Sequence, residues 1–129
     1  MKILLKGGRV INPENKFDAV ADVLVEDGKI VKIGVGIEDN ADEVYNVAGK
    51  VVTPGLIDLH VHLREPGQEA KEDFASGSKA AAAGGFTTIC TMPNTKPVVD
   101  SAALVRSLKM RAQEAACVNV EIIGAVTKN

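Results

Sequence analysis

Two histidines separated by one residue constrain this chain more than any other feature. They are the only histidines among its 129 residues, His60 and His62, and they interrupt an apolar run. Side chains alternate between the two faces of a strand, so we expect Asp58, His60, His62 and Arg64 to share one face. Two imidazoles between a carboxylate and a guanidinium are costly to bury unless a ligand occupies that face. This stretch therefore predicts a strand with a binding face.

The pattern changes near residue 55. Residues 1–55 contain short alternating runs joined by turns, with Asp27-Gly28 as the clearest hairpin signal. They predict a small antiparallel sheet, with a break in the first strand at Gly7-Gly8. From residue 56 to 129, apolar strands alternate with helical patterns in the order strand, helix, strand, helix, strand. That order is typical of an α/β fold with parallel strands and right-handed crossovers.

Residue patterns give approximate bounds for the elements of this second part. A Pro-Gly loop follows the first strand, Gly84-Gly85 ends the first helix, and Asp100 or Ser101 can cap the second. The expected ranges are strand 56–63, helix 71–83, strand 86–92, a helix running to 116, and strand 118–126. Three parallel strands and two helices leave a face or an edge uncovered. We therefore expect these residues to be the front part of something larger or to need a partner, with an independent short domain as the alternative.

Composition excludes several classes of function. The formal net charge of −2 gives no basic surface for nucleic acid, and aromatic residues are few (3%), with no Trp for stacking bases. No apolar run approaches the ~20 residues of a membrane span. Cys90 and Cys117 are isolated in the sequence, so we expect buried free thiols and a cytoplasmic location.

The histidine pair is a candidate metal site. Neutral imidazole is the commonest protein ligand of metals, and i, i+2 spacing on a strand aims both rings the same way. Catalytic sites in βα folds lie at the carboxyl ends of the strands, which is where His60 and His62 fall. Asp58 could orient an imidazole from behind, or could cap or form an ion pair deeper in the strand. Two histidines on a solvated, inert strand face remain the alternative.

Two further side chains fall at the same expected rim. Arg64 can hold a carboxylate through two parallel hydrogen bonds, or could form an ion pair with Glu65 instead. Asn94 follows the next strand and could bind a carboxylate or a ring group, although it also suits the turn after Pro93. The side chains of His60, His62, Arg64 and Asn94 together predict a metal beside an anion-binding site.

Several motifs resemble dihydroorotase of the metal-dependent amidohydrolase superfamily, and more narrowly its type I long form. They are Gly55–Gly67, Lys71–Phe74, Ala82–Thr88 and Met92–Thr95. The pairing of Arg64 with the Met-Pro-Asn-Thr run selects dihydroorotase, because hydantoinase-like and allantoinase-like enzymes do not usually carry both.

The resemblance implies a (β/α)8 TIM barrel beside a small β-sandwich built from both chain ends. It implies one or two zinc ions, with His60 and His62 as ligands and Arg64 and Asn94 on the substrate carboxylate. The family reaction interconverts dihydroorotate and N-carbamoyl-L-aspartate in pyrimidine biosynthesis, with the metal activating water and polarising the ring carbonyl. It also implies a small-molecule substrate, and a homodimer or a complex with aspartate transcarbamoylase as assembly.

The chain departs from the family pattern in extent. It has no third histidine, and a full barrel takes ~250 residues. We therefore expect an N-terminal portion of a dihydroorotase that carries no catalytic residue of its own and is inactive alone. The alternatives are a hydantoinase or allantoinase type of cyclic amidohydrolase and a non-catalytic, dihydroorotase-like partner of aspartate transcarbamoylase.

Overall fold

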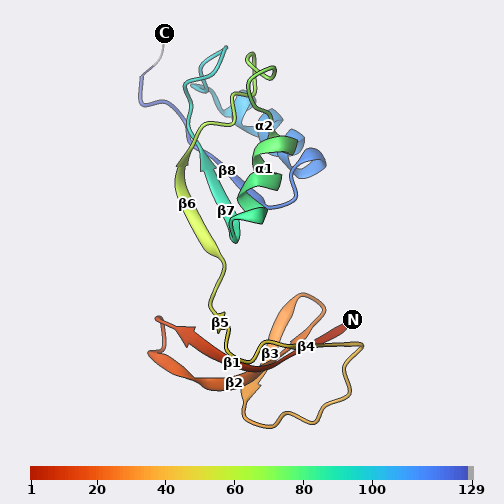
Figure 1. Ribbon diagram of the computed structural model, residues 1–129. Coiled ribbons are helices and arrows are strands. Elements are labelled where there is room, and N and C mark those ends of the chain that lie inside the picture. The colour runs from red at the N-terminus through yellow and green to blue at the C-terminus, as the bar shows by residue number, and fades with distance from the viewer. Residues whose placement is uncertain (128–129) are drawn as a thin grey trace. The chain divides into compact units, whose positions relative to one another are not determined.

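The computed structural model describes residues 1–127 and divides into two compact units, one spanning Met1–Pro54 and one beginning at Gly55 (Figure 1). The first unit is a five-stranded sheet in the order β3-β2-β1-β4, with β5 also paired to β1. Its strands are β1 (Lys2–Asn12), β2 (Phe17–Glu26), β3 (Lys29–Gly34), β4 (Glu43–Asn46) and β5 (Val51–Val52).

This first sheet is mixed, so the expectation of an antiparallel sheet is wrong in part. β2 pairs antiparallel with β1 and β3, whereas β4 and β5 pair parallel with β1. After β3 the chain crosses to the side of β1 that is opposite to β2, and β4 then runs parallel to β1. A hairpin cannot connect parallel strands. Short strands carry no mark of their partner in their own residues, so local pattern could not reveal this pairing.

The expected break at Gly7-Gly8 is also wrong, because β1 continues through it with a β-bulge. The register shifts between Leu5, opposite Val23, and Gly8, opposite Ala21. Gly7 takes a φ of 74°, a left-handed conformation that glycine adopts without steric cost. The bulge turns the Gly7 N–H toward Asp22, whose Oδ1 accepts it at 2.8 Å.

Asp22 joins three parts of the first unit. It is buried, with 5% of its surface exposed, and its Oδ2 accepts a hydrogen bond from the Ile37 N–H at 2.9 Å. Ile37 packs with Leu4 and Leu24 in a small core. The donors at Ile37 and Gly7 lower the pKa of the Asp22 carboxyl, because they stabilise its ionised form.

The second unit contains a three-stranded parallel sheet in the order β6-β7-β8, with α1 and α2 packed against it (Figure 1). Its elements are β6 (Leu56–Val61), α1 (Phe74–Ala83), β7 (Phe86–Thr91), α2 (Ala102–Ala115) and β8 (Asn119–Ile122). The α/β character predicted from the sequence is confirmed. β8 ends at Ile122, short of the expected residue 126.

Local capping explains where the two helices begin. Asp73 caps α1 through a reciprocal pair with Ser76: the Ser76 N–H donates to Asp73 Oδ1 at 2.7 Å, and the Asp73 N–H donates to Ser76 Oγ at 3.2 Å. The helix therefore starts at Phe74, three residues later than expected. Ser101 caps α2, which is one of the two caps expected from the sequence.

One apolar core joins the sheet to both helices. Its buried members come from the loops, β7 and the helices: Leu63, Phe74, Ile89, Val99, Leu108 and Ala112. Ser78 of α1 is fully buried and its Oγ accepts the Cys117 N–H at 3.1 Å. The expectation of two buried thiols is wrong, because Cys117 is exposed just after α2 and Cys90 is half-buried. No helix of residues 1–127 has the length and apolar character needed to cross a membrane.

We predict that Asp22→Ala lowers the free energy of unfolding of the first unit by about 2 kcal/mol at pH 7, because two backbone donors lose their acceptor. The Asp22 contribution is fully present above the pKa of the unfolded carboxyl, about 3.9, and is lost as pH falls through the lower folded pKa. Urea unfolding of both proteins at pH 7 and at low pH measures this. Asp18→Ala, which removes an exposed ion pair with Arg9 from the same strand, is the control. An equal loss in the control would contradict the prediction.

Candidate metal and anion site at the end of β6

β6 ends at Val61, so the predicted strand is two residues too long and His62 and Arg64 lie in the loop that follows. The strand also carries a bulge. Asp58 pairs with Ile89 and Val61 with Thr91, so three steps along β6 match two steps along β7. The extra residue breaks the period-two alternation from which a single polar face was expected.

The two imidazoles nevertheless come together. Their ring centroids are 5.2 Å apart, with an angle of 67° between the ring planes, and both side chains are exposed. Oδ1 of Asp58 accepts the backbone N–H of His60 at 3.0 Å. Asp58 therefore contacts the main chain of His60, and it steadies the bulge from which that ring projects.

Asn94 meets the second histidine. Its Oδ1 lies 2.9 Å from Nδ1 of His62, although the two residues are 32 positions apart in the sequence. An amide oxygen only accepts hydrogen bonds, so this contact requires a proton on Nδ1 of His62, and in the neutral ring that tautomer leaves the lone pair of Nε2 available. The Asn94 amide group retains its own Nδ2 hydrogens as donors. The expected meeting of the loops after β6 and β7 is thus present, but with a contact to His62 that the sequence had not indicated.

Arg64 occupies a strained turn. Its φ is 61°, in the left-handed region, and the Glu65 N–H donates to the Leu63 carbonyl across it at 2.8 Å. This is a γ-turn, and for a residue other than glycine the conformation costs on the order of 1 kcal/mol. Within residues 1–127 Arg64 forms no ion pair, and Glu65 pairs elsewhere, so the alternative of an Arg64–Glu65 ion pair is wrong.

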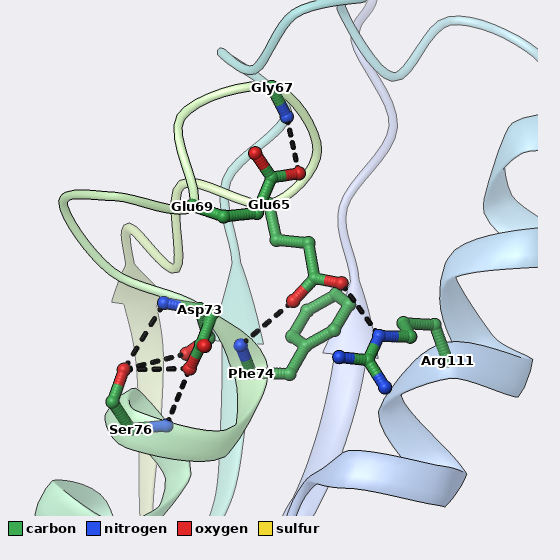
Figure 2. Close-up of polar contacts among 7 residues, drawn as sticks. All are labelled: Glu65, Gly67, Glu69, Asp73, Phe74, Ser76 and Arg111. Carbon is green, nitrogen blue, oxygen red and sulfur yellow. Dashed lines mark hydrogen bonds and ion pairs between the residues drawn. The ribbon is translucent and has the colours of Figure 1, made fainter.

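Glu65 has partners in the structure that the sequence did not indicate. Its side chain is 9% exposed, and it accepts a hydrogen bond from Nε of Arg111 on α2 at 2.9 Å. Its second oxygen accepts the Phe74 N–H at the start of α1, at 3.0 Å. Figure 2 shows this carboxylate between the two helices. A glutamate before Pro-Gly looks like a loop residue, and only its neighbours in space distinguish it.

Backbone contacts tie the loop after β6 to the loop after β7. The Lys96 N–H donates to the Pro66 carbonyl at 3.0 Å, and Gly67 lies against the Lys96 carbonyl. A Cβ at Gly67 would come 2.0 Å from that oxygen, and Gly67 has a φ of 90°, so only glycine fits. The two loops that carry Arg64 and Asn94 are therefore fixed to each other.

His60 and His62 are the candidate metal ligands that the structure brings together. In the part of the chain from Met1 to Thr127, no group of three His, Cys, Asp or Glu side chains could hold one ion. A catalytic zinc site typically has three protein ligands. His60 and His62 can therefore supply two ligands of such a site and not the whole of it.

Solved structures with a similar fold include hydantoinases. The chain is 31% identical to an L-hydantoinase (dihydropyrimidinase) from Arthrobacter aurescens, with a TM-score of 0.84 over 95% of this chain and 27% of the other. A dihydropyrimidinase from Brevibacillus agri gives a TM-score of 0.84 at 29% identity, covering 100% of this chain and 28% of the other. The fold of the chain is thus the fold of part of these hydantoinase and dihydropyrimidinase structures.

Sequence comparison gives the particular family. A family model described as dihydro-orotase-like matches residues 49–129, more than half of the chain, and the chain belongs to that family. Curated relatives named dihydroorotase include one from Elusimicrobium minutum, 50% identical over 100% of this chain, and one from Solibacter usitatus, 52% identical over 99%. The chain spans 30% of the length of each. The resemblance to dihydroorotase is confirmed.

We predict that Asn94→Leu shifts the tautomer of His62. Without the amide acceptor, the proton on Nδ1 is no longer favoured and the Nε2-protonated form gains population. Long-range 15N–1H NMR of histidine-labelled protein distinguishes the two forms. His60, which has no contact with Asn94, is the internal control. An unchanged His62 spectrum would show that Asn94 does not set its tautomer.

Proposed function

We propose that residues 55–97 form one part of the active site of a zinc-dependent dihydroorotase. The reaction is the interconversion of dihydroorotate and N-carbamoyl-L-aspartate in pyrimidine biosynthesis. The observation that carries the proposal is the convergence of His60, His62 and Asn94 at the end of β6, with Arg64 in the adjoining turn. The proposal is supported by curated relatives, at about 50% identity, that are named dihydroorotase.

The two histidines suit a zinc ion. Neutral imidazoles are common zinc ligands, and the contact of Asn94 with Nδ1 of His62 leaves Nε2 to bind. An outer partner on the second ring nitrogen is the usual way in which a protein fixes the orientation of a metal-binding histidine. Asp58 supports His60 through its backbone. The remaining ligands of one or two zinc ions would come from outside residues 1–127.

When bound, zinc would supply a Lewis acid for the ring carbonyl and an activated water. The other residues act on the substrate itself. The Arg64 guanidinium, which has no ion-pair partner among the described residues, can bind the substrate carboxylate with two parallel hydrogen bonds. Asn94 keeps two Nδ2 hydrogens with which to donate to the same carboxylate. The two side chains thereby orient the ring next to the histidines.

The proposal extends to fold and location. The elements from β6 to β8 would be the first βαβαβ part of a TIM barrel, with residues 1–55 as a β-sandwich segment, as the resemblance to dihydroorotase implies. The similar fold of a hydantoinase and a dihydropyrimidinase supports the α/β character of this proposal. A barrel would cover β6, whose Ile57 and Leu59 are 61% and 71% exposed. A cytoplasmic location, and a homodimer or a complex with aspartate transcarbamoylase, remain predictions.

Two alternatives differ in chemistry. One is a hydantoinase or allantoinase activity, of which the structural similarity, at 29–31% identity, favours only the hydantoinase type. Arg64 and Asn94 argue against it, because a carboxylate on the ring distinguishes dihydroorotate from hydantoin. A non-catalytic partner of aspartate transcarbamoylase is the other alternative. The intact pair of His60 and His62 argues against loss of the metal centre.

We predict that the product of the native reading frame that encodes this chain hydrolyses dihydroorotate, and that the 129-residue chain alone does not. The second expectation follows because two imidazoles do not complete a catalytic zinc site. Ultraviolet assays of dihydroorotate, hydantoin and allantoin, with and without added zinc, measure both. Turnover of hydantoin or allantoin without dihydroorotate would favour the first alternative, and metal-dependent turnover by the 129-residue chain would refute the second expectation.

We predict that replacing both His60 and His62 with Ala in that gene product removes bound zinc. Loss of two of the protein ligands leaves too few donors to hold the ion. Metal analysis after dialysis gives the stoichiometry, and circular dichroism shows whether the fold persists. Replacing the half-buried thiol by Cys90→Ser is the control. Full zinc content in the double histidine variant would show that the histidines are bystanders.

A further inference from the structure

We propose that Glu65 is a positioning residue that holds Arg64 in its substrate-binding conformation through the ion pair with Arg111. The proposal rests on the proposed function, in which Arg64 binds the substrate carboxylate. It adds that substrate binding by Arg64 requires the ion pair between Glu65, in the loop after β6, and Arg111 of α2. Neither Glu65 nor Arg111 would touch substrate in this role.

The argument begins with the strain at Arg64. A left-handed γ-turn at a residue with a long side chain persists only where its neighbours leave no alternative. Leu63 on one side is 3% exposed and packs into the core of the second unit. Glu65 on the other side is 8% exposed as a whole residue. The residues before and after the turn are thus buried, while Arg64 itself is half-exposed.

The anchor at Glu65 is polar, so it depends on its partners. One carboxylate oxygen accepts the Phe74 N–H at 3.0 Å, and the other accepts Arg111 Nε at 2.9 Å (Figure 2). Phe74 begins α1 and is fully buried, and Arg111 lies on α2. The carboxylate therefore fixes the turn to two helices at once. A buried carboxylate without its cation would be poorly solvated, so losing Arg111 frees the turn.

Backbone contacts also connect Glu65 to the loop that carries Asn94. Pro66 follows Glu65 directly, and its carbonyl accepts the Lys96 N–H at 3.0 Å, while Gly67 packs against the Lys96 carbonyl. Asn94 lies two residues before Lys96 and holds His62. If Glu65 lost these contacts, the distance between Arg64 and Asn94 would no longer be fixed. These are the two side chains proposed to bind one carboxylate.

Glu65→Gln in the full gene product tests the proposal. Glutamine keeps the shape of the side chain but presents no negative charge to Arg111. A displaced Arg64 weakens substrate binding in the ground and transition states alike, so KM for dihydroorotate should rise roughly tenfold while kcat changes little. Arg111→Gln should do the same, and Arg111→Lys should recover part of the loss. Glu121→Gln, which removes the exposed ion pair between Glu121 of β8 and Lys109 of α2, is the matched control and should leave KM unchanged.

A double variant separates positioning from general stability. If Glu65 acts through Arg64, then Glu65→Gln should raise KM no further in an Arg64→Gln background. The same rise in both backgrounds, or a lower kcat at unchanged KM, would overturn the proposal.

Hydrogen exchange gives a readout that does not need turnover. Glu65→Gln should speed exchange in peptides covering residues 62–73 and 93–97, and Glu121→Gln should not. If the wild-type protein does not turn over dihydroorotate, the proposed function fails, and exchange still decides the positioning role. Unchanged exchange in both peptides would overturn it.

Discussion

The geometry of the proposed site depends on the hydrogen bond and the ion pair that the buried Glu65 carboxylate forms. This carboxylate lies between the first turn of α1 and Arg111 of α2, directly after the strained turn at Arg64. The cost of burying a carboxylate is offset because both of its oxygens accept hydrogen bonds. The Arg111 side chain of this ion pair is 50% exposed to solvent. The Glu65–Arg111 ion pair matters more for the geometry of the turn at Arg64 than for the free energy of unfolding, because partly exposed ion pairs contribute little free energy.

The site is assembled from two loops that leave the same edge of a parallel sheet. Parallel strands bring their carboxyl ends together, so residues far apart in sequence meet there, as His62 and Asn94 do. The bulge in β6 and the γ-turn at Arg64 then aim individual side chains within that edge. Both features depart from regular strand geometry, and both fall where a ligand is proposed to bind. Such departures are common next to binding sites, where a side chain must be re-aimed.

Regular elements were predictable because their signals are local. The caps at Asp73 and Ser101 illustrate this: Ser101 was one of two caps expected from the sequence, and Asp73 shortened a helix whose existence was expected. The strand around His60 was expected from its alternation, but its end was misplaced because nothing in the residues themselves marks the bulge. Pairing of β4 and β5 with β1 was missed for a related reason. Parallel and antiparallel partners impose almost the same local pattern on a short strand.

The α/β character of the second unit, the histidine pair and the family follow from the sequence, because spacing and motif are properties of the chain alone. The contacts of each polar side chain, by contrast, depend on how the elements pack in space. The tertiary structure assigned Asp58 to a backbone N–H, Asn94 to His62, and Glu65 to Arg111 in place of Arg64. These partners lie 2, 32 and 46 positions apart along the chain. A carboxylate or amide accepts any donor within reach, and which donors are within reach is fixed by the packing of helices on the sheet.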